Sequence, residues 1–187
     1  MAKRQATTRI IAGKYRGTKL TFKPNKSLRP TESKTKETLF NWLLNDLDNK
    51  NCLDMFAGTG SLGFEALSRG AKEVIFIEKQ KSLCNSIENV AKQLGIKKKC
   101  RIINANSTSI NFNNLNAKFD LIFLDPPFNK SYINLLLPKI ISDFTKTGTL
   151  IYIEESNFNF SDYDRELKLL KKTSSGNSFG RLFEVRL

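Results

Sequence analysis

The feature that most restricts the fold of this 187-residue chain is a regular alternation of short apolar runs with segments of helical periodicity. Runs suited to strands lie at 52–57, 74–77, 101–104, 119–124 and 149–153. Helical patterns lie at 61–68, 81–94 and 132–144. The run at 119–124 is apolar almost throughout, which is typical of a strand covered on both faces. The alternation predicts an α/β fold with a mostly parallel sheet and right-handed crossovers, closed by a hairpin at 166–170 and 182–187.

Composition excludes several classes of function. The chain has no histidine, which rules out a histidine base, a catalytic triad with histidine and a histidine-ligated metal. Its three cysteines stand at wide, unpatterned spacings, which indicates reduced thiols rather than a disulfide framework or a zinc site. No apolar run approaches the roughly 20 residues that span a bilayer, and the first residues lack the apolar stretch of a signal peptide. We therefore expect a cytoplasmic protein that binds neither a membrane nor a metal.

Basic charge is concentrated at the N-terminus. Residues 1–36 hold eleven Lys and Arg residues against one acid, so they carry +10 of the net charge of +13. Short apolar runs at 9–12 and 19–22 flank a turn with a glycine at each end, which predicts a β-hairpin with a cationic tip. Such an extension is typical of nucleic-acid-binding proteins, although a solubilising tail has the same composition. From charge and position we expect RNA contacts from Lys14, Tyr15, Arg16, Arg29 and Lys36.

The composition shift divides the chain into a basic extension at 1–30 and a main domain at 31–187. A helix is expected soon after this boundary, because apolar residues recur there at helical spacing. These residues are Phe40, Leu43, Leu44 and Leu47.

A glycine-rich segment stands where the first core strand meets the next helix. Gly58, Gly60 and Gly63 have the spacing of a dinucleotide-binding turn, and Glu78 ends the following strand. A carboxylate at that position can accept hydrogen bonds from the ribose hydroxyls of NAD or of S-adenosylmethionine. Asp54, four residues before the first glycine, can pair with the cationic amine of S-adenosylmethionine. The combination favours S-adenosylmethionine over NAD, and over a glycine turn that binds no ligand.

The tetrapeptide Asp125–Phe128 follows the fourth core strand. Its two prolines fix φ and remove two N–H donors, so the loop is stiff and offers carbonyl oxygens. An exocyclic base amine is a poor nucleophile, because its lone pair is delocalised into the ring. Asp125 and the Pro126 carbonyl can accept its N–H bonds and direct the lone pair at a methyl group, while Phe128 stacks on the base. The alternative is a proline-rich turn in which the aspartate caps a helix.

These motifs together resemble those of class I S-adenosylmethionine-dependent amino-methyltransferases. Longer strings are more specific: DMFAGTGSLGFEALSRGA at 54–71, LRPT at 28–31, KETLFN at 36–41 and GKYRG at 13–17. Over nearly the whole chain they resemble the RsmD family, the bacterial methyltransferases that act on guanine N2 of 16S ribosomal RNA. The resemblance implies a Rossmann-like seven-stranded sheet with a short N-terminal extension, and S-adenosylmethionine as cofactor. It also implies a monomer that methylates one guanine of 16S ribosomal RNA in the 30S particle.

By this resemblance, the cofactor-binding residues are Asp54, Phe56, Gly58, Gly60, Glu78 and Asn106, and the amine pocket is formed by Asp125, Pro126 and Phe128. Lys36 stands where many family members have arginine. The same pocket can serve adenine N6, so an adenine-N6 methyltransferase of RNA or DNA is one alternative. An inactive assembly factor that binds ribosomal RNA is a second. An NAD-dependent dehydrogenase is a third, although the sequence offers no evident proton donor for it.

Overall fold

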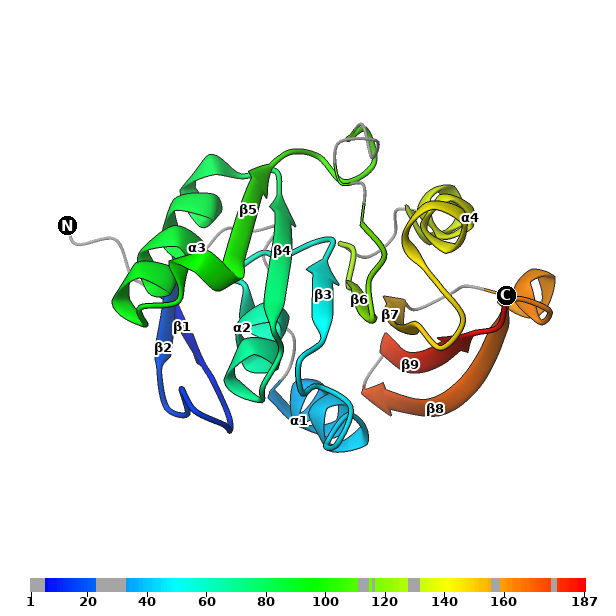
Figure 1. The fold of residues 1–187 in the computed structure, drawn as a ribbon, viewed down its shortest axis with the longest axis horizontal. Coiled ribbons are helices and arrows are strands. Elements are labelled where there is room, and N and C mark those ends of the chain that lie inside the picture. The colour runs from blue at the N-terminus through cyan, green and yellow to red at the C-terminus, as the bar shows by residue number, and fades with distance from the viewer. Residues whose placement is uncertain are drawn as a thin grey trace.

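In a computed structural model, the protein is described at residues 6–22, 33–110, 115, 117–127, 132–155, 159–175 and 178–187. Seven strands form one sheet in the order β5-β4-β3-β6-β7-β9-β8 (Figure 1). Their bounds are β3 (Asn51–Asp54), β4 (Glu73–Glu78), β5 (Cys100–Asn104), β6 (Leu121–Leu124), β7 (Leu150–Glu155), β8 (Leu167–Ser175) and β9 (Ser178–Val185). The first five in that order run parallel, and β9 is antiparallel to both β7 and β8. The predicted Rossmann-like α/β fold and its closing hairpin are confirmed.

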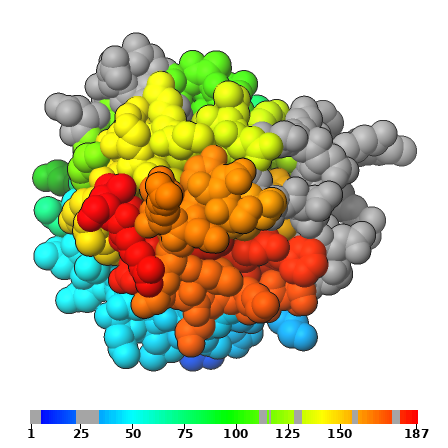
Figure 2. All heavy atoms as spheres, turned by 90° about the vertical axis from the view of Figure 1, so that its right-hand side faces the viewer, coloured from blue at the N-terminus to red at the C-terminus, as the bar shows by residue number. Residues whose placement is uncertain are grey.

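Helices cover both faces of this sheet. Packed on one face are α1 (Ser33–Trp42), α2 (Ser61–Ser68), α3 (Lys81–Gln93) and a separate hairpin of β1 (Ala6–Arg9) and β2 (Lys19–Phe22). The other face is covered by α4 (Tyr132–Phe144) and by the short helix η3 (Ser161–Tyr163). Figure 2 views the molecule from the β8 side, where α4 and the β8–β9 hairpin form adjoining parts of the surface. None of the helices in the described ranges is long and apolar enough to cross a membrane.

The register of the parallel strands brings their carboxyl ends to one edge of the sheet. Asp54 on β3 pairs with Phe76 on β4 and with Phe123 on β6. On the neighbouring strands β4 and β5, Glu78 pairs with Asn104. In an open α/β sheet, ligands bind beyond the carboxyl ends of the strands. The predicted site residues that end or follow β3, β4 and β6 therefore share one edge.

Three local predictions need correction. The first strand of the N-terminal hairpin lies at Ala6–Arg9 rather than 9–12, because the backbone N–H groups of Ile11 and Ala12 donate to a side chain outside the hairpin. The strand predicted at 52–57 ends at Asp54, where the glycine-rich connection begins. Leu44 is 64% exposed, because α1 ends at Trp42 and the apolar stripe does not continue along one helix.

The side chain that receives those N–H groups is Glu65, in the middle of α2. It has no exposed surface. Its Oε2 accepts from Ile11 N at 2.7 Å, and its Oε1 accepts from Ala12 N at 3.0 Å and from Arg69 Nε at 2.8 Å. Lys36 Nζ on α1 lies 3.9 Å from Oε2. One buried carboxylate thus joins the hairpin, α1 and α2.

The tip of the hairpin is fixed to the end of the same helix. The Ser68 hydroxyl donates to Ala12 O at 2.5 Å and accepts from Tyr15 N at 2.9 Å, and Ser68 O accepts from Lys14 N at 2.7 Å. Gly13 has φ of 79°, and a Cβ at this position would lie 2.0 Å from Ser68 O. Only glycine allows this approach. The hairpin is therefore packed onto the main body, and the predicted boundary at residue 30 lies outside the described residues.

We predict that Glu65→Ala lowers the free energy of unfolding by about 3–5 kcal/mol, because it leaves the buried Lys36 ammonium without its counter-charge. Denaturant titration measures this loss. The double variant Glu65→Ala/Lys36→Met is expected to lose less than the sum of the two single changes.

Glu88→Ala is the control. Glu88 forms ion pairs with Lys92 and Lys97 at the surface, so its removal is expected to lower the free energy of unfolding far less than Glu65→Ala does. Equal losses from the two alanine variants would contradict the role given to Glu65.

Candidate active site

The connection from β3 to α2 is shaped by its glycines. Gly58 and Gly60 have φ of 52° and 76°, and Gly60 is the N-cap of α2. A Cβ on Gly63 would lie 2.2 Å from the ring of Phe76 on β4, so this glycine allows the helix to lie close to the sheet. The three glycines thus have the roles expected for this spacing: a tight turn, a close backbone approach and close helix packing.

The side chain of Asp54, the last residue of β3, lies at the N-terminus of α2. Its Oδ2 accepts from Gly63 N at 3.1 Å, and the residue is 2% exposed. Burial raises the pKa of this carboxyl to about 7, opposed by the Gly63 hydrogen bond and reinforced by the charge of Glu78. Because the positive end of the helix dipole is already complemented by a carboxylate, the turn is poorly suited to a pyrophosphate and well suited to a cationic group.

Glu78 connects two loops at the same edge. Its Oε2 accepts from Gly58 N at 2.9 Å and its Oε1 accepts from Gln80 N at 2.7 Å. The Asn104 amide donates to the backbone oxygens of Glu78 and Lys79, each at 2.9 Å. The carboxylate is thereby held at the end of β4, and each of its oxygens has a second lone pair for a ligand hydroxyl.

The loops after β3 and β5 carry the remaining predicted cofactor residues. Phe56 stacks on Tyr132 at the start of α4, with ring centroids 5.9 Å apart. Asn106 is exposed, and its Oδ1 accepts from the backbone N of Thr108 at 3.2 Å. Sequence reasoning missed Ser107, whose buried hydroxyl donates to Met55 O and joins the two loops. A small polar residue in an asparagine-rich loop carries no distinctive signal.

The predicted amine pocket follows β6. Asp125 is half-buried and Pro126 is buried, while Phe128 lies outside the described residues. On the neighbouring strand β7, the Tyr152 hydroxyl donates to Glu154 Oε2 at 3.1 Å. Burial raises the pKa of Tyr152, and the charges of Glu154 and Asp125 raise it further. The signal for Glu154 was present in the sequence, where two acids follow the apolar run at 149–153.

The predicted RNA contacts that fall in the described residues do not gather at this edge. Lys14 and Arg16 are exposed at the hairpin tip, where Tyr15 is partly packed against the core. The tip binds Ser68, at the opposite end of α2 from Gly60. An eight-residue helix is about 12 Å long, so the tip lies well away from the glycine loop.

The prediction that Lys36 contacts RNA is wrong for this structure. Lys36 is 1% exposed, and its Nζ donates to Arg9 O at 2.7 Å and to Ser61 Oγ at 2.9 Å. Burial lowers its pKa, against the opposing effect of Glu65. The Lys36 ammonium therefore binds partners inside the protein. Arg29 lies outside the described residues.

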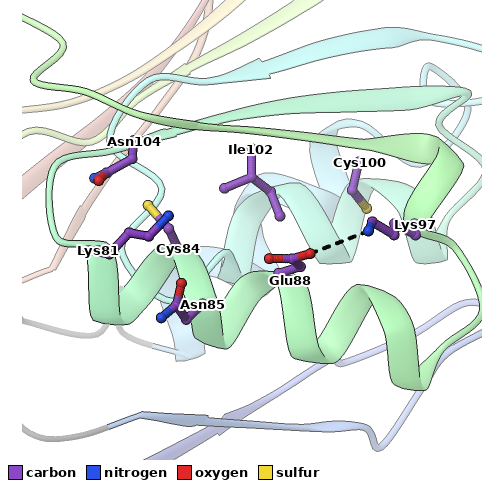
Figure 3. A pocket seen from close by; sticks show the side chains of 8 residues that line it. All are labelled: Lys81, Cys84, Asn85, Glu88, Lys97, Cys100, Ile102 and Asn104. Atoms are coloured by element: carbon purple, nitrogen blue, oxygen red, sulfur yellow. Dashed lines mark ion pairs between the residues drawn. The ribbon is translucent and has the colours of Figure 1, made fainter.

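A separate pocket of about 230 Å³ lies between α3 and the edge strand β5 (Figure 3). It is lined by Lys81, Cys84, Asn85, Glu88, Lys97, Cys100, Ile102 and Asn104. Lys97 Nζ lies 3.4 Å from Glu88 Oε1 at one end of it. Its lining includes none of the predicted cofactor residues, so this pocket is distinct from the candidate site.

Comparisons with known proteins identify the family and support the fold. The profile of a family described as conserved hypothetical protein 95 matches residues 8–184. A Haemophilus influenzae protein named ribosomal RNA small subunit methyltransferase D is 39% identical over 182 residues, which make up 94% of this chain and 93% of the relative. The solved structure of a candidate methyltransferase from Escherichia coli matches with a TM-score of 0.81 at 30% identity, covering 96% of this chain and 98% of that one.

A more distant solved structure shares the fold alone. It is an RNA methyltransferase from Salinibacter ruber in complex with S-adenosyl-L-homocysteine. The TM-score is 0.65 at 14% identity, and the match covers 84% of this chain and 94% of that one.

The raised pKa of Asp54 generates a prediction about stability. The folded protein binds the proton of the Asp54 carboxyl more tightly than the unfolded chain does. The protonated carboxyl therefore contributes to the free energy of unfolding below pH 4, and this contribution is lost as the pH rises through about 7. We expect the unfolding free energy of the native protein, relative to Asp54→Asn, to fall by about 3 kcal/mol between pH 4.5 and pH 8. Denaturant titrations of both proteins at the two pH values measure this difference.

The comparison with Asp54→Asn removes the contributions of all other titrating groups, because asparagine keeps the acceptor for Gly63 N and has no proton to lose. A difference that stays constant with pH would show that Asp54 is ionised throughout this range.

Proposed function

Because this chain belongs to the family described as conserved hypothetical protein 95, we propose that it transfers a methyl group from S-adenosylmethionine to the exocyclic N2 amine of a guanine in 16S ribosomal RNA. The observation that carries the proposal is the placement of Asp54 and Asp125 at the carboxyl ends of adjacent parallel strands, β3 and β6. One carboxylate suits a cationic cofactor and the other suits the amine of a base. The name of the Haemophilus influenzae relative supports small-subunit ribosomal RNA as the substrate.

The residues at the carboxyl edge fit S-adenosylmethionine. Gly58, with its positive φ, lets the backbone approach a ligand, and Glu78 at the end of β4 can accept from the ribose hydroxyls. Asp54 complements the positive charge, while Phe56 and Asn106 flank the adenine. When bound, the cofactor supplies an electrophilic methyl group on a sulfonium sulfur. The complex of the Salinibacter ruber protein, which has the same fold, supports this assignment.

The loop after β6 would bind and orient the amine that receives the methyl group. The Asp125 carboxylate and the Pro126 carbonyl accept its two N–H groups, and Phe128 stacks on the base. These acceptors orient the nitrogen and stabilise the positive charge that develops on it during transfer. The nitrogen becomes cationic and strongly acidic as it is methylated, so it can release its proton to the Asp125 carboxylate or to water, and no histidine base is needed. We further propose that the substrate is the 30S particle and that the protein acts as a monomer.

The direct test is methyl transfer from labelled S-adenosylmethionine to unmethylated 30S particles, protein-free 16S ribosomal RNA and duplex DNA. Nucleoside analysis of the product is expected to yield N2-methylguanosine in 16S ribosomal RNA. N6-methyladenine would overturn the choice of base, while the absence of transfer to all three substrates would favour an inactive RNA-binding protein.

Asp125→Ala tests the role of the amine pocket. Because Asp125 acts on the amine, we expect kcat to fall about 10²–10³-fold, with the Kd for S-adenosylmethionine changed less than about threefold. Steady-state kinetics and calorimetry measure the two quantities. Asp46→Ala, at an exposed position after α1, is the control and is expected to leave both unchanged. An unaltered kcat in Asp125→Ala would remove this residue from the mechanism.

The exposed hairpin tip generates a second test. If Lys14 and Arg16 contact phosphates, the double alanine variant should lose up to about 1.8 from the slope of log K for RNA against log salt concentration. Filter binding at several salt concentrations measures the slope. Lys171→Ala/Lys172→Ala removes the same charge from exposed positions on β8, at the far edge of the sheet, and is expected to leave the slope unchanged. Equal effects of the two double variants would mean that the tip binds no specific phosphates.

A further inference from the structure

A buried acid of β7 lies beside the proposed amine pocket. Strands β6 and β7 are parallel, with Leu124 opposite Ile153. Glu154 is the next residue on β7 and Asp125 directly follows the end of β6, so they stand side by side at the carboxyl edge. Since side chains alternate along a strand, Glu154 is directed to the face of Tyr152, opposite to Ile153, and the charge of Asp125 also acts on Tyr152. Glu154 is 6% exposed, close to the 8% of Glu78 at the same edge.

The orientation of Glu154 is set by its own strand and by β9. The Tyr152 hydroxyl, two residues earlier on the same face, donates to Glu154 Oε2 at 3.1 Å. Gly180 is the cross-strand partner of Glu154, and a Cβ there would lie 2.7 Å from the Tyr152 hydroxyl oxygen. Glycine thus leaves the space that the tyrosine needs. Burial and the nearby acids raise the pKa of Tyr152, so its hydroxyl remains a donor at neutral pH.

The next acid, Glu155, has a different environment. It lies on the other face of β7, opposite Phe179 and near Arg181, whose pKa its charge raises against the larger effect of burial. Glu155 is 7% exposed, so the two acids are equally buried. They differ in what they face: Glu155 faces an arginine, and Glu154 lies beside Asp125. This pair offers a matched comparison for any role of Glu154.

Guanine presents a pattern that suits two neighbouring carboxylates. The ring N1–H and the exocyclic N2 amine are adjacent donors on one edge of the base. A carboxylate is an acceptor only, so it attracts N1–H of guanine and repels the N1 lone pair of adenine. Neighbouring strands are about 4.8 Å apart, which allows acids on β6 and β7 to reach adjacent atoms of one base.

We propose that Glu154, held by Tyr152, determines base specificity by accepting a hydrogen bond from N1–H of the target guanine while Asp125 holds the N2 amine. This inference rests on the proposed function and adds a specificity-determining residue to it. Guanine is then selected because its N1–H donates to the buried Glu154 carboxylate. A base without such a donor leaves this acceptor unpaired. Leaving such an acceptor unpaired is costly, so the discrimination is expected to be large.

The test replaces the target guanine with 2-aminopurine, which keeps the reactive amine but has a lone pair in place of N1–H. Ribosomal RNA with this single substitution is made by ligation, and kcat/KM is measured for both bases with the full-length enzyme. We expect the native enzyme to prefer guanine by about 100-fold or more. Glu154→Gln should reduce this preference to less than about tenfold, because the glutamine amide can donate to the 2-aminopurine N1.

Glu155→Gln is the matched control and is expected to keep the native preference. Tyr152→Phe is a second variant that keeps the ring and the acid but removes the orienting donor, so its preference for guanine should also fall. A native preference below tenfold, or an unchanged preference in both Glu154→Gln and Tyr152→Phe, would overturn the inference. The absence of guanine methylation by the native enzyme would instead overturn the proposed function.

Discussion

The interaction on which much of this structure depends is the buried carboxylate of Glu65. A charge without exposed surface needs several partners, and Glu65 receives them from the hairpin backbone and from Arg69, with Lys36 nearby. These partners come from three segments that are separate in the sequence. Their convergence fixes the position of α2, and the N-terminus of α2 carries the glycine loop. The geometry of the candidate site is therefore linked to a charge cluster in the middle of the same helix.

The second constraint is the parallel register, which collects acids at one edge of the sheet. Asp54, Glu78, Asp125 and Glu154 lie at or near the carboxyl ends of four adjacent strands. Burial and like charge hold the pKa of Asp54 near 7, and only a cationic partner would fully relieve that cost. Each acid nevertheless has its own local donor or neighbour, which gives the four carboxylates different tasks. Such a site suits a positively charged methyl donor and an amine that becomes positive during the reaction.

The basic extension shows where reasoning from composition reaches its limit. Charge counts along residues 1–36 are the same whether a lysine faces solvent or the core. Lys36 faces the core because α1 places it against Ser61 and the hairpin backbone, whereas Lys14 and Arg16 are exposed at the tip. Leu44 shows the opposite case, an apolar residue left at the surface because its helix ends early. In both cases the decision came from packing between segments.

The sequence by itself determined the α/β class, the positions of most strands and helices, and the identities of the glycine and proline-rich loops. These features depend on local periodicity and on residues whose backbone preferences are strong, so they can be recognised within a short window. Only the tertiary structure decided that Glu65 binds the hairpin, that the hairpin tip lies away from the carboxyl edge, and that Glu154 rather than Glu155 stands beside Asp125. Those outcomes depend on strand register and on contacts between distant segments, which local patterns do not encode.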